Sequence, residues 1–276
     1  MPHTIAFLNK KGGVGKTSTC HHLAGTLARQ GRRVLLLDAD PQASLTQGFW
    51  GPEAMRAIPG ESSVAALFDS ETEPIPAALI RPSGLESIDL IPRSEALTPY
   101  NHPDTVRWVR HQGGIRDFLA EARDGYDLAL IDCPPNLHLC SWTALVAADA
   151  VVVPLQAEDY GAQDIVSVQE AVAAVRLHAN PSLHLLGYLI TMFDKRLGIH
   201  TMYEGTLRQL YSDEVFTHPF PLAKDFKEAV AARLPISHYK PKSAAAKAAA
   251  SVAAELLERC AAIGSDAAKA GDRRVA

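Results

Sequence analysis

The sequence predicts an α/β fold built on a mainly parallel, twisted sheet with helices on both faces. Short runs rich in Val, Ile and Leu alternate with longer segments of helical periodicity, as in successive βαβ units. These runs are apolar at almost every position, which is typical of strands that are covered on both faces. The predicted strands are 4–8, 34–37, 128–131, 150–155 and 185–191, and the predicted helices are 16–30, 105–123, 161–178, 200–211, 223–233 and 243–262.

The predicted elements differ in how strongly the sequence specifies them. Three consecutive valines, at 151–153, make the clearest buried strand, and the alanine-rich segment 243–262 is a strong helix former. Residues 50–103 are interrupted by prolines and give no detailed prediction, so they are interpreted as a lid or a partner surface.

Length and composition indicate one folded domain. The 276 residues are 47% hydrophobic and 21% charged, close to globular averages, which excludes disordered, collagen-like and coiled-coil proteins. No linker divides the chain, so we expect a single domain over 1–264 and a frayed tail over 265–276. No apolar run reaches the roughly 18 residues of a membrane span, and no secretion signal is found, so we expect a cytoplasmic protein without membrane contact.

Charge is distributed unevenly along the chain. The 27 Lys and Arg residues and 31 Asp and Glu residues give a net charge of −4, yet residues 195–276 alone hold 13 basic and 9 acidic residues. This local excess of +4 is a weak indication of a polyanionic partner.

A glycine-rich loop follows the first predicted strand and precedes the first predicted helix, over residues 10–17 (KKGGVGKT). Glycines allow backbone N–H groups to approach phosphate oxygens, and the helix N-terminus adds partial positive charge. Lys16 is placed to contact the β and γ phosphates, and the Thr17 hydroxyl suits Mg²⁺. The loop therefore predicts binding of a nucleotide triphosphate with magnesium.

The loop departs from the general G-x-x-x-x-G-K-[ST] pattern because Lys10 occupies the position of the first glycine and Lys11 follows it. This is the deviant K-G-G-x-x-K-[ST] form, and here the sequence resembles the ParA/MinD ATPases, a group that includes the nitrogenase iron protein. The resemblance implies a single-domain P-loop NTPase with ATP and Mg²⁺ as ligands. It also implies that Lys11 reaches the partner's phosphates across a nucleotide-sandwich homodimer, where it would act like an arginine finger. The residues expected to bind the nucleotide are Lys11, Gly12, Gly13, Val14, Gly15, Lys16, Thr17 and Ser18.

Carboxylates follow two of the other predicted strands, at the sheet edge where ligands of α/β proteins bind. Asp40 begins a D-P-Q segment that resembles the family's switch, whose Asp orients or activates the attacking water near Mg²⁺. Asp132 resembles the Walker B carboxylate that holds Mg²⁺ through water. Asp38 is interpreted either as a group that contacts the metal ligands rather than the metal, or as a helix cap. By resemblance the catalytic residues are Lys11, Lys16 and Asp40, and the metal site comprises Thr17, Asp40 and Asp132.

Two later segments extend the resemblance. Residues 191–196 (TMFDKR) resemble the family's T-M-x-D-x-R segment, and residues 220–236 resemble its proline and E-A pieces. By resemblance, Met192 and Pro221 line the adenine. Leu222 and Asp225 stand where the family often has arginines that contact DNA. The expected DNA-binding residues are Arg196, Lys224 and Lys227.

The favoured function is that of a ParA-type ATPase for plasmid or chromosome partition. The resemblance implies an ATP-dependent homodimer that binds double-stranded DNA without sequence preference, associates with the nucleoid and is stimulated by a ParB-like protein. A MinD-like membrane cycle is disfavoured because residues 243–276 are dominated by Ala. A cargo-positioning ATPase is left open. An iron–sulfur carrier of the nitrogenase iron protein type is less favoured, because Cys133 and Cys140 share one loop.

Overall fold

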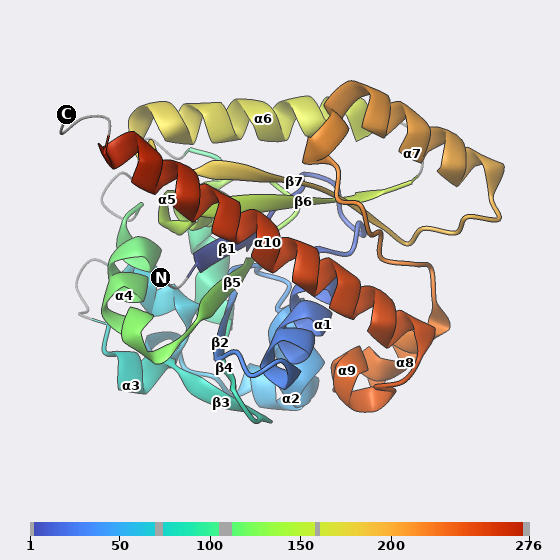
Figure 1. Cartoon of the computed structure of the whole chain (residues 1–276). Coiled ribbons are helices and arrows are strands. Elements are labelled where there is room, and N and C mark those ends of the chain that lie inside the picture. The colour runs from blue at the N-terminus through green and yellow to red at the C-terminus, as the bar shows by residue number, and fades with distance from the viewer. Residues whose placement is uncertain (1–2, 70–73, 105–111, 158–160, 273–276) are drawn as a thin grey trace.

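The computed structural model describes residues 3–69, 74–104, 112–157 and 161–272. Within these residues, seven strands form one sheet in the order β3-β4-β2-β5-β1-β6-β7, and Figure 1 shows helices packed on both of its faces. Every neighbouring pair is parallel except β3 with β4, at one edge. The predicted α/β class and the mainly parallel sheet are confirmed.

The helices and strands follow one another along the chain as β1 (His3–Phe7), α1 (Lys16–Arg29), β2 (Val34–Asp38), α2 (Ser44–Arg56), α3 (Pro76–Leu79), β3 (Arg81–Leu85), β4 (Ile88–Ile91), α4 (Gly114–Ala122), β5 (Leu128–Asp132), α5 (Leu139–Ala147), β6 (Ala150–Gln156), α6 (Gly161–His178), β7 (His184–Thr191), α7 (Gly198–Tyr211), α8 (Lys224–Ala231), α9 (Ile236–Tyr239) and α10 (Ala244–Asp272). The five predicted strands match β1, β2, β5, β6 and β7 to within one residue at each end. The helix predicted over 105–123 is found as α4, and residues 105–111 lie outside the described part of the chain.

Apolar side chains alternate between the two faces of the sheet and build one core on each. In β1, Ile5 and Phe7 join the core beneath α1, α2 and α10, whereas Ala6 joins the core beneath α4, α5 and α6. In β2, Leu36 joins the core beneath α1, α2 and α10, and Leu35 joins the other core. Strands covered on both sides explain the continuous apolar runs in the sequence. The carboxyl edge of the sheet is consequently held between two packed layers.

Residues 50–103 form an integral part of the sheet and core. They supply β3, β4 and most of α2, and η2 (Val64–Phe68) is buried along its whole length. The interpretation of this segment as a lid is therefore wrong for its described residues. The prolines that obscured the pattern lie in irregular connections, inside α2 and in the antiparallel edge strand β3, where a missing N–H is tolerated.

Helix α10 crosses one face of the sheet diagonally (Figure 1). Its inner side is buried at Ala249, Val252, Ala253 and Leu256, so its apolar surface is used in the core rather than offered to a membrane. The helix continues to Asp272, well beyond the predicted end at 262 and through much of the tail predicted as frayed, because alanine favours helix so strongly. Among the described residues, no helix is both long enough and apolar enough to cross a bilayer.

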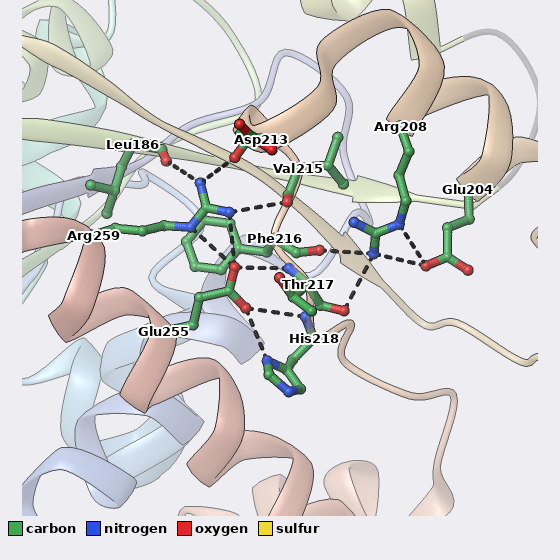
Figure 2. Close-up of polar contacts among 10 residues, drawn as sticks. All are labelled: Leu186, Glu204, Arg208, Asp213, Val215, Phe216, Thr217, His218, Glu255 and Arg259. Atoms are coloured by element: carbon green, nitrogen blue, oxygen red, sulfur yellow. Dashed lines mark hydrogen bonds and ion pairs between the residues drawn. The ribbon is translucent and has the colours of Figure 1, made fainter.

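A polar cluster fastens α10 to the connection that leads out of α7 (Figure 2). The Glu255 carboxylate accepts the backbone N–H groups of Thr217 and His218 at 2.8 and 3.1 Å. Arg259 donates to three backbone oxygens, those of Leu186, Asp213 and Val215, at 2.9–3.1 Å. Carbonyls that would otherwise lack partners in this irregular segment are thereby satisfied.

The pairing register between β6 and β7 also shifts, between Val151 and Val152. Gly187, in β7, has φ of 144°, and a Cβ atom there would lie 2.2 Å from the Glu214 oxygen. Only glycine fits this position without moving the backbone. The connection between α7 and α8 can therefore pass close against β7.

A buried histidine lies on α1 directly behind the glycine loop. The His21 ring packs against Phe49 and His22, with ring centroids 4.5 and 5.0 Å away. Burial lowers the pKa of His21 to about 4, from 6.5. The ring therefore stays neutral in the folded protein at pH values where the unfolded chain binds a proton.

We expect the free energy of unfolding to decrease as the pH falls from about 6.5 towards 4, because protons then bind the unfolded state preferentially. The His21→Leu variant has no imidazole there, so the part of this pH dependence that comes from protonation of His21 should be lost. Between pH 6.5 and 5 the contribution of His21 is about 1.5 kcal/mol. Urea unfolding followed by circular dichroism measures it, and equal losses in parent and variant would contradict the assignment.

Candidate active site

The glycine loop joins β1 to α1 and is fixed at both ends by buried side chains. Gly13 and Gly15 have φ of 79° and 85°, left-handed values that favour glycine. The Asn9 side chain accepts the Lys11 N–H at 2.9 Å and donates to the Pro154 oxygen at 2.7 Å. The loop is thereby shaped before any ligand binds, with its N–H groups at the start of a helix.

Lys16 enters the site from the first turn of α1. It is buried, and its Nζ donates to the Lys11 backbone oxygen at 3.1 Å. Burial lowers the pKa of Lys16, while the charges of Asp132 and Asp40 oppose this shift. A cation held in this way inside the loop is placed to contact phosphate oxygens.

Asp132 ends β5, and its neighbours in the sheet are Phe7 of β1 and Asp38 of β2. The side chain is fully buried, and neither carboxylate oxygen has a hydrogen-bond partner among the described residues. Burial and the nearby Asp38 raise the pKa of Asp132 well above its usual range, and the Thr17 hydroxyl acts in the opposite direction. An orphaned carboxylate beside a threonine hydroxyl fits Mg²⁺, which prefers oxygen ligands.

The second strand supplies two carboxylates with different roles. Asp38 accepts the Thr46 N–H at 2.8 Å and its hydroxyl at 2.6 Å, so it anchors the first turn of α2. Burial raises its pKa to about 6. Asp40 accepts the Gln42 N–H at 2.9 Å and faces the polar side of the loop. Asp38 is thus structural, and Asp40 is the carboxylate available to a ligand or a water molecule.

Two cavities adjoin the loop, and both contact Gly15 and Ser18. One, of about 420 Å³, is the more polar of the two and is lined by the loop glycines, Lys16, Thr17 and Asp40; we call it the polar cavity. The other, of about 330 Å³, is largely apolar, and its wall includes the predicted Met192 and Pro221. A polar and an apolar chamber on either side of one loop fit a triphosphate and a base respectively.

The remaining predicted residues lie outside the polar cavity. Lys11 is exposed at the lip of the loop. Arg196 is 82% exposed and pairs with Asp194 through two guanidinium contacts. Lys224 is 85% exposed and lies 3.5 Å from Glu228. Lys227 is exposed on α8 and lines the apolar cavity.

Asn9 and Arg93 carried no local signal in the sequence, and Thr191 was noted only as the first residue of the TMFDKR segment. Asn9 and the Thr191 hydroxyl fix the loop through partners more than a hundred positions away, the latter at 2.8 Å from the Val14 oxygen. Arg93 is buried just beyond β4. Its backbone N–H donates to the Thr46 hydroxyl, and its charge, with that of Lys16, partly opposes the rise in the pKa of Asp40 that burial causes. Only their position after apolar strands could have suggested them.

The fold and the loop together define a P-loop ATPase, and residues 2–185 match the AAA domain family. The chain is 37% identical to the chromosome-partitioning ATPase Soj of Thermus thermophilus over 257 residues, which cover 92% of this chain and 95% of that protein. It is 32% identical to the chromosome partitioning protein ParA of Myxococcus xanthus over 273 residues, covering 99% and 92%. The chain belongs to the ParA/Soj family of partition ATPases.

One solved structure has a similar fold and was determined with a nucleotide analogue bound. The cobyrinic acid a,c-diamide synthase of Mycobacterium smegmatis, with bound ATP analogue and magnesium, has a TM-score of 0.77 at 26% identity and covers 93% of this chain and 94% of that chain. ATP and Mg²⁺ are accordingly the cofactors of this site. Magnesium would neutralise charge on the phosphates, and Thr17, Asp40 and Asp132 are the oxygen groups that would hold it.

The iron–sulfur alternative finds no support in the cysteines. Cys133 follows β5 and Cys140 lies in α5, and both thiols are buried. Neither is presented to a second subunit, as a shared cluster would require.

Asp132→Asn should separate ligand binding from stability. Burial raises the pKa of Asp132 in the nucleotide-free protein, so the free energy of unfolding of the parent should fall as the pH rises above about 4, where the unfolded chain releases this proton more readily than the folded one. The amide should therefore be more stable than the parent at pH 8, by about 1 to 3 kcal/mol. The strengthening of ATP binding by Mg²⁺ should be lost in a calorimetric titration. Asp124→Asn, on an exposed turn, is the control, and a variant that keeps the Mg²⁺ effect would contradict the metal assignment.

Proposed function

We propose that this protein partitions DNA by an ATP-driven cycle of dimerisation. ATP and Mg²⁺ would join two subunits face to face, the dimer would bind DNA without sequence preference, and a ParB-like protein would stimulate hydrolysis and release. The observation that carries the proposal is Lys11, an exposed lysine at the lip of an otherwise buried phosphate site. A buried Lys16 already serves the loop from within, so the second cation is free to act elsewhere.

The two lysines differ in what surrounds them. Lys16 is buried among carboxylates, whereas the Lys11 side chain makes no hydrogen bond or ion pair with any described residue. A lysine that crosses to the partner's phosphates would place charge where it develops during phosphoryl transfer. Asp40 would orient the attacking water, because its carboxylate faces the polar cavity.

Lys16→Ala should abolish ATP binding, because it removes the cation inside the loop. Lys11→Ala should bind ATP in the monomer almost as the parent does, yet fail to dimerise with ATP and Mg²⁺. Asp40→Ala should bind ATP and accumulate as a dimer, because hydrolysis slows by about a hundredfold or more. Titration with labelled nucleotide and light scattering measure the two properties separately.

Lys10→Ala is the matched control, since it removes the neighbouring exposed lysine. Equal loss of ATP binding in the Lys11 and Lys16 variants would overturn the proposal that Lys11 contacts the partner's phosphates. An Asp40→Ala variant that hydrolyses ATP at the parental rate would exclude Asp40 from the water-activating role.

DNA binding would use the basic excess of the C-terminal third. Arg196, Lys224 and Lys227 are all exposed; Arg196 pairs with the largely buried Asp194, and Lys224 pairs with Glu228. Exposed ion pairs contribute about 0 to 1 kcal/mol, so a phosphate can readily replace the Glu228 carboxylate as the partner of Lys224. Dimerisation would double the number of such cations facing the duplex, and affinity for a polyanion rises steeply with that number.

Random-sequence duplex should bind with ATP and Mg²⁺ far more tightly than with ADP, as measured by fluorescence anisotropy. Arg196→Ala with Lys224→Ala should weaken binding, and the slope of log affinity against log salt should fall by about 0.9 for each phosphate that the variant no longer neutralises. Arg29→Ala with Arg32→Ala removes the same charge at the far end of α1 and serves as the control. A greater loss of affinity in the control pair would place the DNA surface there.

A further inference from the structure

The apolar cavity beside the glycine loop carries one charged side chain. Its described wall comprises Gly15, Ser18, Thr19, Thr191, Met192, Phe220, Pro221, Leu222, Ala223, Phe226, Lys227 and Val230. Lys227 is the one ionisable group among these, and it comes from the exposed side of α8. Because Lys227 is exposed and also lines the cavity, its flexible side chain can bring the ammonium group to a polar atom of a ligand that enters.

The other lysines around α8 are engaged. Lys240 donates to Asp225 and Glu228 at 2.8 and 2.6 Å, and Lys224 lies 3.5 Å from Glu228. Lys227 makes no hydrogen bond or ion pair with any residue that the structure describes. Its ammonium group is therefore available to a ligand without first breaking a protein contact.

The cavity offers few other polar groups to a ligand. The Thr191 hydroxyl lies 2.8 Å from the Val14 oxygen and 3.1 Å from the Leu155 oxygen, so its proton is already used within the protein. Met192, Phe220 and Phe226 provide apolar surface, which favours any flat ring equally. Orientation of the ligand must therefore depend on a small number of donors, of which Lys227 is the charged one.

We propose that Lys227 recognises the nucleoside of bound ATP by donating a hydrogen bond to an acceptor atom of the base or the ribose. The inference rests on the proposed placement of ATP, with phosphates in the polar cavity and the base in the apolar one. An ammonium group donates and cannot accept, so it selects a ring nitrogen or a hydroxyl oxygen. Lys227 is thereby a recognition residue for nucleotide rather than part of the DNA surface.

Calorimetric titration of Lys227→Met with ATP and Mg²⁺ tests the proposed hydrogen bond. Methionine keeps the length of the side chain and removes the charge, and the Kd should rise about five- to tenfold. Lys247→Met, which removes an exposed lysine from α10, should leave the Kd unchanged. An unchanged Kd in Lys227→Met overturns the inference, whereas failure of the parent itself to bind ATP would overturn the proposed function.

Analogues that lack one acceptor at a time locate the hydrogen bond. The set comprises 1-deaza-ATP, 3-deaza-ATP, 7-deaza-ATP, 2′-deoxy-ATP and 3′-deoxy-ATP. For one of these, parent and Lys227→Met should bind with nearly equal Kd, because the acceptor is already missing. An equal loss for all five analogues would show that the lysine acts on the phosphates, which contradicts the proposal.

A DNA-binding measurement at saturating ATP separates the two roles of Lys227. The proposal expects Lys227→Met to bind duplex like the parent once the nucleotide site is filled. Weakened DNA binding together with an unchanged Kd for ATP would assign Lys227 to the DNA surface instead.

Discussion

The burial of three carboxyl groups at the carboxyl edge of the sheet determines how this site is organised. Burial raises the pKa of Asp38, Asp40 and Asp132, and Lys16 offers a buried cation beside them. Neither oxygen of the Asp132 carboxyl group has a hydrogen-bond partner among the described residues, so a divalent cation bound there would stabilise the ionised form over the protonated one. Ligand binding and folding stability are therefore linked through the same few atoms.

The rest of the architecture holds those atoms in place. Parallel pairing sets Asp38 beside Asp132, and the two cores prevent the strands from moving apart. Asn9 and Thr191 tie the loop to β6 and β7, so its shape does not depend on phosphate. A site prepared in this way loses little conformational entropy when a nucleotide binds.

The sequence predicted those features whose signals are local. Buried strands gave continuous apolar runs, and the loop, Asp40 and Asp132 were found because their spacing along the chain is fixed by strand, turn and helix. α2 and β3 were missed because each contains a proline and because β3 is an antiparallel edge strand, and β4 was missed because it is only four residues long. Asn9 and Arg93 were missed for another reason: each acts through residues distant in the sequence, Pro154 for one and Thr46 for the other.

The anchoring of α10 by Arg259 has a practical bearing on how the chain can be extended or cut. The carbonyl oxygens that Arg259 holds belong to the segment that leads to Phe220 and Pro221, and these residues line the apolar cavity. Arg259 lies several helical turns before the end of α10 at Asp272. A fluorescent protein or affinity tag fused after those turns leaves the anchor intact. A truncation that unwinds the helix back to Arg259 would instead free the Asp213 and Val215 carbonyl oxygens and loosen the segment that leads to the nucleotide pocket.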